Sequence, residues 1–381
     1  MRALLPTFVV LNYNQDVALQ CGIVGLPNVG KSTLFNSLSS AKAQAANFPF
    51  CTIEPNVGVI TVPDPRLLKL TELVNPQNVL PNTIEIVDIA GLVKGASKGE
   101  GLGNQFLGNI RDTNAIIHVI RCFDDPNVIH VDGSVHPVRD KEIIDIELQL
   151  KDLDSVEKRI QRIEKQAKGG DKTLQKTLEV LQRAKNHLEA AKSIRSMEMT
   201  PEEKELIRDL HLITIKPVLY LANVDEAAVL HGNAHVDQLR EAIKDEHAEL
   251  LIISAKIESE IAELATLEER KEYLSMYGLQ EPGVHRLITT AYRLLNLITY
   301  FTAGVKEVRA WQIELNTKAP QAAGVIHSDF EKGFIRAEVI SYQDFISYGS
   351  ESACRDAGKI RVEGKEYVVA DGDIMHFRFN V

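Results

Sequence analysis

The hydrophobic pattern of the first third of the chain alternates short apolar runs with loops and helix-like stretches. Such runs occupy residues 21–24, 57–62, 83–87 and 115–121. Strands that alternate with helices are typical of a mostly parallel sheet covered by helices. Two more apolar runs, at residues 217–222 and 250–254, predict that the same sheet resumes later in the chain.

The pattern changes to a helical period between those two parts of the sheet. Apolar residues recur at steps of three and four from Ile146 to Ile163, and again from Leu174 to Leu188. A Lys-Gly-Gly-Asp sequence at residues 168–171 separates the two series. This pattern predicts an antiparallel helical hairpin, or coiled coil, inserted at about residues 141–198 of a single domain. The alternative is two ordinary helices packed on the core, and the long polar faces favour the hairpin.

The last quarter of the chain is β-rich. Helices are predicted to start at Thr200-Pro201 and at Glu281-Pro282, the second reaching about residue 297. Strands are predicted at residues 305–313, 333–340, 359–362, 367–369 and 374–379. We therefore expect an extension at residues 1–18, a first domain at 19–274, a connecting helix at 275–295 and a second domain at 296–379.

A phosphate-binding loop is the most specific motif. Residues 25–32 read Gly-Leu-Pro-Asn-Val-Gly-Lys-Ser, directly after a predicted strand and before a helix predicted at residues 33–40. In such a loop the backbone N–H groups surround the β-phosphate, the lysine reaches the β- and γ-phosphates and the serine hydroxyl binds Mg²⁺. The residues expected to contact nucleotide here are Gly25, Asn28, Val29, Gly30, Lys31, Ser32 and Thr33.

Three residues further along the chain are candidates for Mg²⁺ and the γ-phosphate. Asp88 ends the strand at 83–87 and can hold Mg²⁺ through water, and the N–H of Gly91 can turn to the γ-phosphate. The hydroxyl of Thr52, in the loop between, would join Ser32 as a Mg²⁺ ligand. Residues 91–103 hold five glycines, which predicts a loop ordered by its ligand.

The expected catalytic position departs from that of many GTPases. A glutamine often follows this Asp-x-x-Gly sequence and orients the attacking water, but here the position is Leu92. A leucine cannot hydrogen-bond water, so we expect slow hydrolysis unless another group acts. His130 is the polar candidate that we name for that role, and the alternative is a packing or surface histidine.

The predicted base-recognition loop departs as well. A guanine-selecting loop reads Asn-Lys-x-Asp, whereas Asn223-Val224-Asp225-Glu226 follows the strand at 217–222. The lysine is absent and the last residue is longer by one methylene, so guanine selection is not encoded in the usual way and ATP becomes a candidate. Ser254 and Ala255 begin a Ser-Ala-Lys sequence whose backbone would touch the base edge.

Composition describes an ordinary globular protein. Apolar residues make up 44% and charged residues 25%, which excludes a disordered or fibrous chain. Cys21, Cys51, Cys122 and Cys354 form no metal or disulfide pattern, as expected for reduced thiols. No signal peptide or membrane span is predicted, so we expect a cytoplasmic protein without membrane contact.

The net charge is unevenly distributed. The 43 Lys and Arg and 53 Asp and Glu give −10 overall, which favours solubility and argues against nucleic acid. Residues 158–195, however, hold 11 Lys and Arg against 4 Asp and Glu, a net +7. A solvated helix face is one explanation, and an RNA-facing arm with Lys165, Lys168 and Lys172 is the other.

The motifs at residues 25–32, 47–56, 88–103, 223–226 and 300–311 together resemble the YchF-type (Obg-like) ATPases, in the Obg branch of translation-factor-like P-loop GTPases. The resemblance covers about residues 19–381. It implies an OBG-type P-loop domain, a C-terminal TGS domain with a β-grasp fold, Mg²⁺ on Ser32 and Thr52, and adenine flanked by Val224. It also implies ribosome association.

The expected function is a Mg²⁺-dependent nucleotide switch. The chain would hydrolyse ATP slowly to ADP and phosphate, with GTP left open, and would bind ribosome or RNA through the hairpin and the TGS domain as a monomer. Two alternatives are an RNA- or ribosome-binding scaffold with incidental hydrolysis, and a conventional GTPase.

Overall fold

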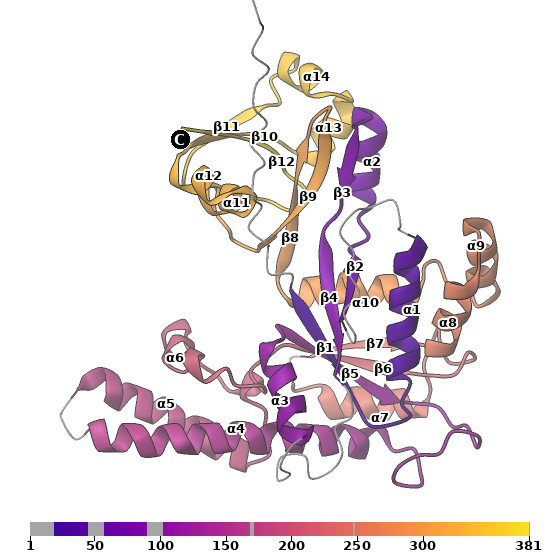
Figure 1. Ribbon diagram of the computed structural model, residues 1–381, viewed down its shortest axis with the longest axis vertical. Coiled ribbons are helices and arrows are strands. Elements are labelled where there is room, and N and C mark those ends of the chain that lie inside the picture. Colours follow the sequence, from indigo (N-terminus) through magenta and orange to yellow (C-terminus); the bar gives the residue numbers. More distant parts are fainter. Residues whose placement is uncertain (1–18, 45–56, 90–101, 168–170, 247, 381) are drawn as a thin grey trace, which may run out of the picture. The chain divides into compact units, whose positions relative to one another are not determined.

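The computed structural model describes residues 19–44, 57–89, 102–167, 171–246 and 248–380. The chain forms two compact units (Figure 1). We call Leu19–Pro63 with Thr83–Leu295 the phosphate-loop unit, and Asp64–Asn82 with Asn296–Val381 the C-terminal unit. This division differs from consecutive domains at 19–274 and 296–379, because Asp64–Asn82 belongs with the C-terminal unit. In the part of the chain described, no helix is long and apolar enough to cross a membrane.

The phosphate-loop unit is built on a six-stranded sheet in the order β2-β4-β1-β5-β6-β7. β2 pairs with β4 in antiparallel fashion and the other neighbours are parallel, so the sheet is mixed at one edge. Every residue of β5 is buried, as expected for a central strand covered on both faces. The strands are β1 (Gln20–Val24), β2 (Val57–Thr61), β4 (Thr83–Asp88), β5 (Ala115–Arg121), β6 (Val218–Asn223) and β7 (Glu249–Ile253).

Helices bury one continuous apolar core against this sheet. In this core α1 packs against α8, and α10 packs against β6 and β7. Asn233 and Ser254 cap two of the helices by accepting hydrogen bonds from backbone N–H groups in their first turns. The helices are α1 (Lys31–Gln44), α3 (Leu102–Asp112), α7 (Ala234–Ile243), α8 (Ala255–Glu263), α9 (Leu267–Met276) and α10 (Gly283–Leu294).

The predicted helical hairpin is present and extends away from the sheet of its own unit (Figure 1). α4 (Pro137–Ala167) is longer than expected, because its first turns pack on β5 and α7, and α5 (Lys172–Glu189) is shorter. The two helices share a core of their own that includes Val156, Ile160 and Leu181. Shorter helices follow, namely η1 (Ile194–Ser196), α6 (Pro201–Leu206) with a Thr200 capping box, and η2 (Arg208–Leu210).

The C-terminal unit contains a second six-stranded sheet, in the order β11-β10-β12-β8-β9-β3. β3 pairs in parallel with β9, which is why its segment joins this unit. The strand predicted at 367–369 is wrong, because Val368 makes only an isolated bridge to Lys318. The strands are β3 (Asn78–Leu80), β8 (Leu297–Ala303), β9 (Glu307–Glu314), β10 (Phe334–Ile340), β11 (Arg361–Glu363) and β12 (Ile374–Phe379).

Two separate apolar clusters cover the two faces of this second sheet. One contains Tyr300, Trp311 and Phe377, and the other contains Phe301, Phe345 and residues of α2. Adjacent residues of β8 belong to different clusters because side chains alternate along a strand. The helices of this unit are α2 (Pro65–Val74), α11 (Ala319–Ile326), α12 (Ser328–Lys332), α13 (Tyr342–Tyr348) and α14 (Glu351–Asp356).

Candidate functional site: a phosphate loop and a base-recognition loop

The backbone of the phosphate loop requires its two glycines. Gly25 has φ +152° and Gly30 has φ +98°, a region that side chains with a Cβ rarely adopt. A Cβ on Gly25 would lie 2.4 Å from the carbonyl oxygen of Val119. A Cβ on Gly30 would lie 2.3 Å from Nδ2 of Asn223. The loop between β1 and α1 is therefore closely packed against β5 and β6.

Lys31, at the start of α1, and Asp88, at the end of β4, carry charges that act on each other. The ammonium of Lys31 donates to the carbonyl oxygens of Gly25 at 2.9 Å and Leu26 at 2.7 Å. Burial lowers the pKa of Lys31, and the charge of Asp88 opposes that shift. Burial likewise raises the pKa of Asp88, against the effect of Lys31. Two opposite charges in a partly desolvated cradle are suited to a phosphate and a divalent cation.

The donor set fits Mg²⁺. Oδ1 of Asp88 is buried and has no hydrogen-bond partner among the described residues. A buried carboxylate oxygen without a donor is suited to a hydrated cation, and Mg²⁺ prefers oxygen ligands. Ser32 is exposed at the start of α1, where its hydroxyl is free to serve as a ligand. Thr52, Gly91 and Leu92 lie outside the described residues.

Asn223 joins three parts of the site. Its Nδ2 donates to the carbonyl oxygen of Val29 at 2.9 Å, and its Oδ1 accepts from the N–H of Ala255 at 2.9 Å. Its own carbonyl oxygen accepts from the N–H of Cys122. The side chain is only 4% exposed, so these bonds are protected from water. Asn223 thus links the phosphate loop, the end of β5 and the start of α8.

The base-recognition loop does not present a free carboxylate. Glu226 forms an ion pair with Lys256, and this hydrogen bond lowers the pKa of Glu226. Asp225 accepts from the N–H of Ala228 at 3.0 Å, which closes the turn. Val224 is buried and donates its N–H to the carbonyl oxygen of Ile253. Ser254 is fully buried, where its hydroxyl caps α8.

A loop after β5 supports the phosphate loop. The guanidinium of buried Arg121 donates to the carbonyl oxygens of Phe123, Asp125 and Val128. This loop then accepts a hydrogen bond at the carbonyl oxygen of Ile129 from Nδ2 of Asn28, at 3.1 Å. Asn28 itself has φ +62°, a left-handed conformation that asparagine tolerates.

His130 is buried in this supporting loop, and both of its ring nitrogens have partners. Nε2 lies 2.8 Å from Oδ2 of Asp140, and Nδ1 accepts from the N–H of Asp132 at 3.1 Å. The proton therefore resides on Nε2 and is donated to Asp140. Arg139 pairs with the other oxygen of Asp140. This arrangement favours a positioning role for His130 over the orientation of a water molecule, which stays an untested prediction.

The cationic candidates of the hairpin lie at its distal end. Lys165 and Lys172 are exposed, and Lys168 lies outside the described residues. Several other cations of residues 158–195 are already paired. They are Lys158 with Asp154, Arg159 with Asp209, Arg183 with Glu203, Lys185 with Glu157, and buried Arg195 with Glu246. The available positive charge is therefore concentrated near the tip.

Sequence reasoning missed Lys256, Arg121 and Asp140. Lys256 is the third residue of Ser-Ala-Lys, and its separation of 30 positions from Glu226 conceals their contact. Arg121 ends a strand whose other residues are apolar apart from His118, which is a usable signal for a buried structural cation. Asp140 lies in the first turn of α4, where an acidic residue is also explained by the helix dipole.

Two family models match the chain. The model described as "50S ribosome-binding GTPase" matches residues 20–168. The model YchF-GTPase_C, described as "Protein of unknown function (DUF933)", matches residues 297–380. Residues 169–296, which contain the base-recognition loop, lie outside both matches.

Full-length relatives are similar over nearly the whole chain. The "Ribosome-binding ATPase YchF" of Escherichia coli O157:H7 is 57% identical over 365 residues, which is 96% of this chain and 100% of that protein. The protein of the same name from Bacillus subtilis is 55% identical over 367 residues, with the same coverage. The solved "Structure of the Schizosaccharomyces pombe YchF GTPase" has a TM-score of 0.86 and 40% identity, covering 96% of this chain and 99% of that one.

Proposed function

Because the chain belongs to the YchF family of P-loop nucleotidases, we propose that it is a Mg²⁺-dependent ATPase that acts as a nucleotide-controlled switch on the ribosome. The observation that carries this proposal is the pairing of a complete phosphate loop with a base-recognition loop that lacks a free guanine-binding carboxylate. The names of the relatives support both the ATP hydrolysis and the ribosome association.

The residues of the phosphate loop would bind and orient the triphosphate. Lys31 would exchange its two carbonyl bonds for the β- and γ-phosphate oxygens, and the N–H groups at the start of α1 would face the β-phosphate. Ser32 and Thr52 would hold Mg²⁺ directly, and Asp88 would contact it through a water molecule. The cation would neutralise charge on the phosphates. With Leu92 at the usual glutamine position, turnover to ADP and phosphate is slow.

The base-recognition loop supports a preference for ATP over GTP. Guanine offers N1–H and N2–H donors that a free carboxylate accepts, but Lys256 neutralises Glu226. Adenine offers an acceptor at N1, which a free carboxylate would repel. Asn223 would fix the shape of the loop through its hydrogen bonds, and Val224 would flank the adenine through its backbone.

We place the protein in the cytoplasm, where ribosomes are, and propose that it acts as a monomer. Contact with ribosomal RNA would use the hairpin tip, where Lys165 and Lys172 are exposed, and the C-terminal TGS-type unit.

Calorimetric titration with ATP and GTP, each with Mg²⁺, tests the proposal. We expect ATP to bind more tightly, Lys31→Ala to abolish binding, and the exposed control Lys271→Ala to bind normally. Multiple-turnover kinetics should show faster hydrolysis when ribosomes are added. GTP binding tighter by about tenfold or more would favour a conventional GTPase. Turnover that ribosomes do not change would favour a scaffold.

A further inference from the structure

The sheet of the C-terminal unit splits between its two central strands. β8 and β12 run parallel. In the part of the chain that the structure describes, one residue pair joins them, with Ile374 opposite Phe301. The N–H of Phe301 donates to the carbonyl oxygen of Asp373 at 2.8 Å at this point. Beyond it, β8 continues to Ala303 and β12 continues to Phe379, and the two are no longer paired.

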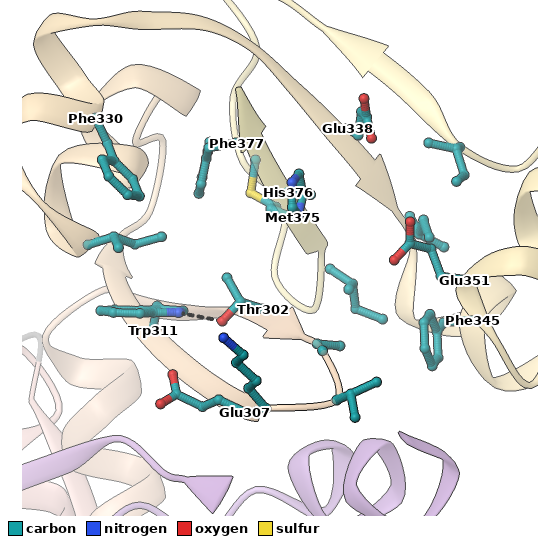
Figure 2. A pocket seen from close by; sticks show the side chains of 18 of the residues that line it. Thr302, Glu307, Trp311, Phe330, Glu338, Phe345, Glu351, Met375, His376 and Phe377 are labelled. Atoms are coloured by element: carbon teal, nitrogen blue, oxygen red, sulfur yellow. Dashed lines mark hydrogen bonds between the residues drawn. The ribbon is translucent and has the colours of Figure 1, made fainter. Parts of the chain in front are cut away.

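A cavity of about 590 Å³ lies at this split. Trp311, Met375 and Phe377 line it from one face of the sheet, and they belong to the cluster covered by α11 and α12. Phe345 and Ile374 line it from the other face, in the cluster covered by α2 and α13. Because both faces contribute to the lining, the cavity passes through the sheet between the strands. Figure 2 shows Trp311 and Glu307 on one side of it and Met375 and His376 across from them.

Backbone groups of both strands face this split. In β8 the residue whose N–H points to β12 is Phe301, so by alternation Ala303 points its N–H and C=O the same way. The backbones of Gly304 and Glu307 each donate a hydrogen bond to the other across the β8–β9 turn. Because hydrogen-bonded pairs alternate along an antiparallel ladder, the N–H and C=O of Ala303 point away from β9 and toward β12. In β12 the same alternation, starting from Asp373, directs backbone groups of Met375 and Phe377 toward β8.

The outer edges of these two strands are occupied. β9 pairs with β8 along its full length, and β10 pairs with β12 from Phe379 to Ile374. Two inward-facing strand edges with apolar walls match an extended polypeptide, which supplies N–H and C=O groups on both sides and alternating side chains to both faces. A rigid small ligand or a nucleic acid base satisfies neither row of backbone groups as fully.

The charge of the lining selects among peptides. Glu307, Glu338 and Glu351 line the cavity together with one lysine, Lys306. Glu338 and Glu351 already have arginine partners, whereas the structure records no ion pair for Glu307 among the described residues. Glu307 is thus the lining carboxylate that can pair with a cationic side chain of a ligand, and it would repel a phosphate group placed beside it.

We propose that this split is a docking site for an extended, basic polypeptide segment of a partner protein, which inserts as an additional strand between β8 and β12. Apolar side chains of the segment would contact Trp311 and Met375, and a lysine or arginine would pair with Glu307. The residues of the nucleotide site belong to the other unit of the chain.

A direct test uses the full chain and an acetylated, amidated hexapeptide of alternating valine and lysine. Trp311 is the protein's one tryptophan, so its fluorescence reports on the cavity without labelling. We expect a saturable change in its emission, together with slower amide hydrogen exchange in the segments that contain Ala303 and Phe377. Two control peptides should each bind at least about tenfold more weakly. One alternates valine with glutamate, and the other is the valine-lysine peptide N-methylated at alternate amides.

A charge reversal and its matched control complete the test. Glu307→Lys should weaken the valine-lysine peptide by about tenfold, while Glu314→Lys, an exposed position on the same strand outside the cavity, should leave its affinity unchanged. Equal binding of the N-methylated peptide would overturn strand insertion. Absence of binding at about 1 mM peptide would overturn the site itself. If a single-stranded RNA oligonucleotide, and not the peptide, changes Trp311 emission, the cavity is a nucleic-acid site and the proposal fails.

Discussion

Asn223 illustrates how much one side chain can organise. Its amide bonds the phosphate loop through Val29 and the start of α8 through Ala255, and it is almost fully buried. An alanine in its place would leave a buried carbonyl and a buried N–H without partners, at a cost of about 1–3 kcal/mol each. Both of those groups belong to loops that surround the expected nucleotide.

We therefore predict that Asn223→Ala weakens ATP binding by about tenfold or more and lowers the thermal unfolding midpoint. Calorimetric titration below that midpoint, with circular dichroism to confirm folding, measures both effects. Asn186→Ala, at an exposed position on α5, serves as the control and should change neither. An Asn223→Ala protein that is destabilised yet binds ATP normally would show that the link to Val29 does not shape the site.

His118 makes stability depend on pH. It lies in fully buried β5, and burial lowers its pKa from 6.5 to about 3, with further contributions from nearby Lys141 and Arg195 and an opposing one from Glu246. Between these two values the unfolded chain binds a proton that the folded chain does not. The free energy of unfolding therefore falls as pH falls below about 6.5, and this contribution is fully present only above that pH.

We predict that this loss approaches about 1.4 kcal/mol per pH unit for the one proton involved. Urea denaturation of the natural protein and of His118→Leu, from about pH 7.5 to about pH 5, isolates it, because the remaining histidines are common to both. The variant should show the shallower dependence. Parallel curves would mean that His118 is protonated in the folded state, contrary to its burial.

At the scale of elements, the hairpin has ion-paired lysines along its length and lysines without recorded ion pairs near its tip. Cations near its base are neutralised by acids, as in Lys158 with Asp154 and Lys185 with Glu157. Lys165 and Lys172, near the tip, have no recorded ion pair among the described residues. Contacts with RNA phosphates should therefore come from the tip, although the net charge of residues 158–195 is spread along both helices.

Neutralising Lys165, Lys168 and Lys172 together to alanine should weaken binding to purified ribosomes. It should also reduce the steepness of the slope of log affinity against log salt concentration by about 2–3, because each phosphate contact contributes about 0.7–0.9 to that slope. Co-sedimentation at a series of salt concentrations measures that slope. The matched variant Lys158→Ala with Lys185→Ala removes paired lysines and should leave the slope nearly unchanged. Equal slopes for all three proteins would remove the tip from the interface.

Local patterns predicted most of the described strands, but they missed β3 and β8, and the strand predicted at residues 367–369 is wrong. The limits of β5 and β12 follow from apolar runs that end in polar residues, and both were predicted correctly. β3 was missed because its three residues become a strand only through pairing with Glu307, Val308 and Arg309, more than 200 positions away. The phosphate loop was recognisable because one short segment carries it, whereas the Glu226–Lys256 pair depends on two loops meeting.

At the scale of the whole molecule, the phosphate loop is one short continuous segment, whereas the C-terminal unit is built from separate segments of chain. The chain leaves the phosphate-loop unit after Pro63, contributes α2 and β3 to the C-terminal unit, and returns at Thr83. The second unit is thus built from two segments of chain, and each unit has apolar cores of its own. Separate cores are the basis on which two units can unfold in separate transitions.

Ligand binding should reveal that separation. Mg²⁺-ATP at about 100 times its Kd stabilises the state that binds it by about 2.7 kcal/mol, and only the phosphate-loop unit holds that site. Trp311 reports unfolding of the C-terminal unit alone, while far-ultraviolet circular dichroism reports both. We predict that Mg²⁺-ATP raises the denaturant midpoint seen by circular dichroism more than the midpoint seen by Trp311. Lys31→Ala, which cannot hold the phosphates, should abolish the difference. Equal shifts of both midpoints in the natural protein would instead mean that β3 and the two chain crossings couple the units into a single cooperative transition.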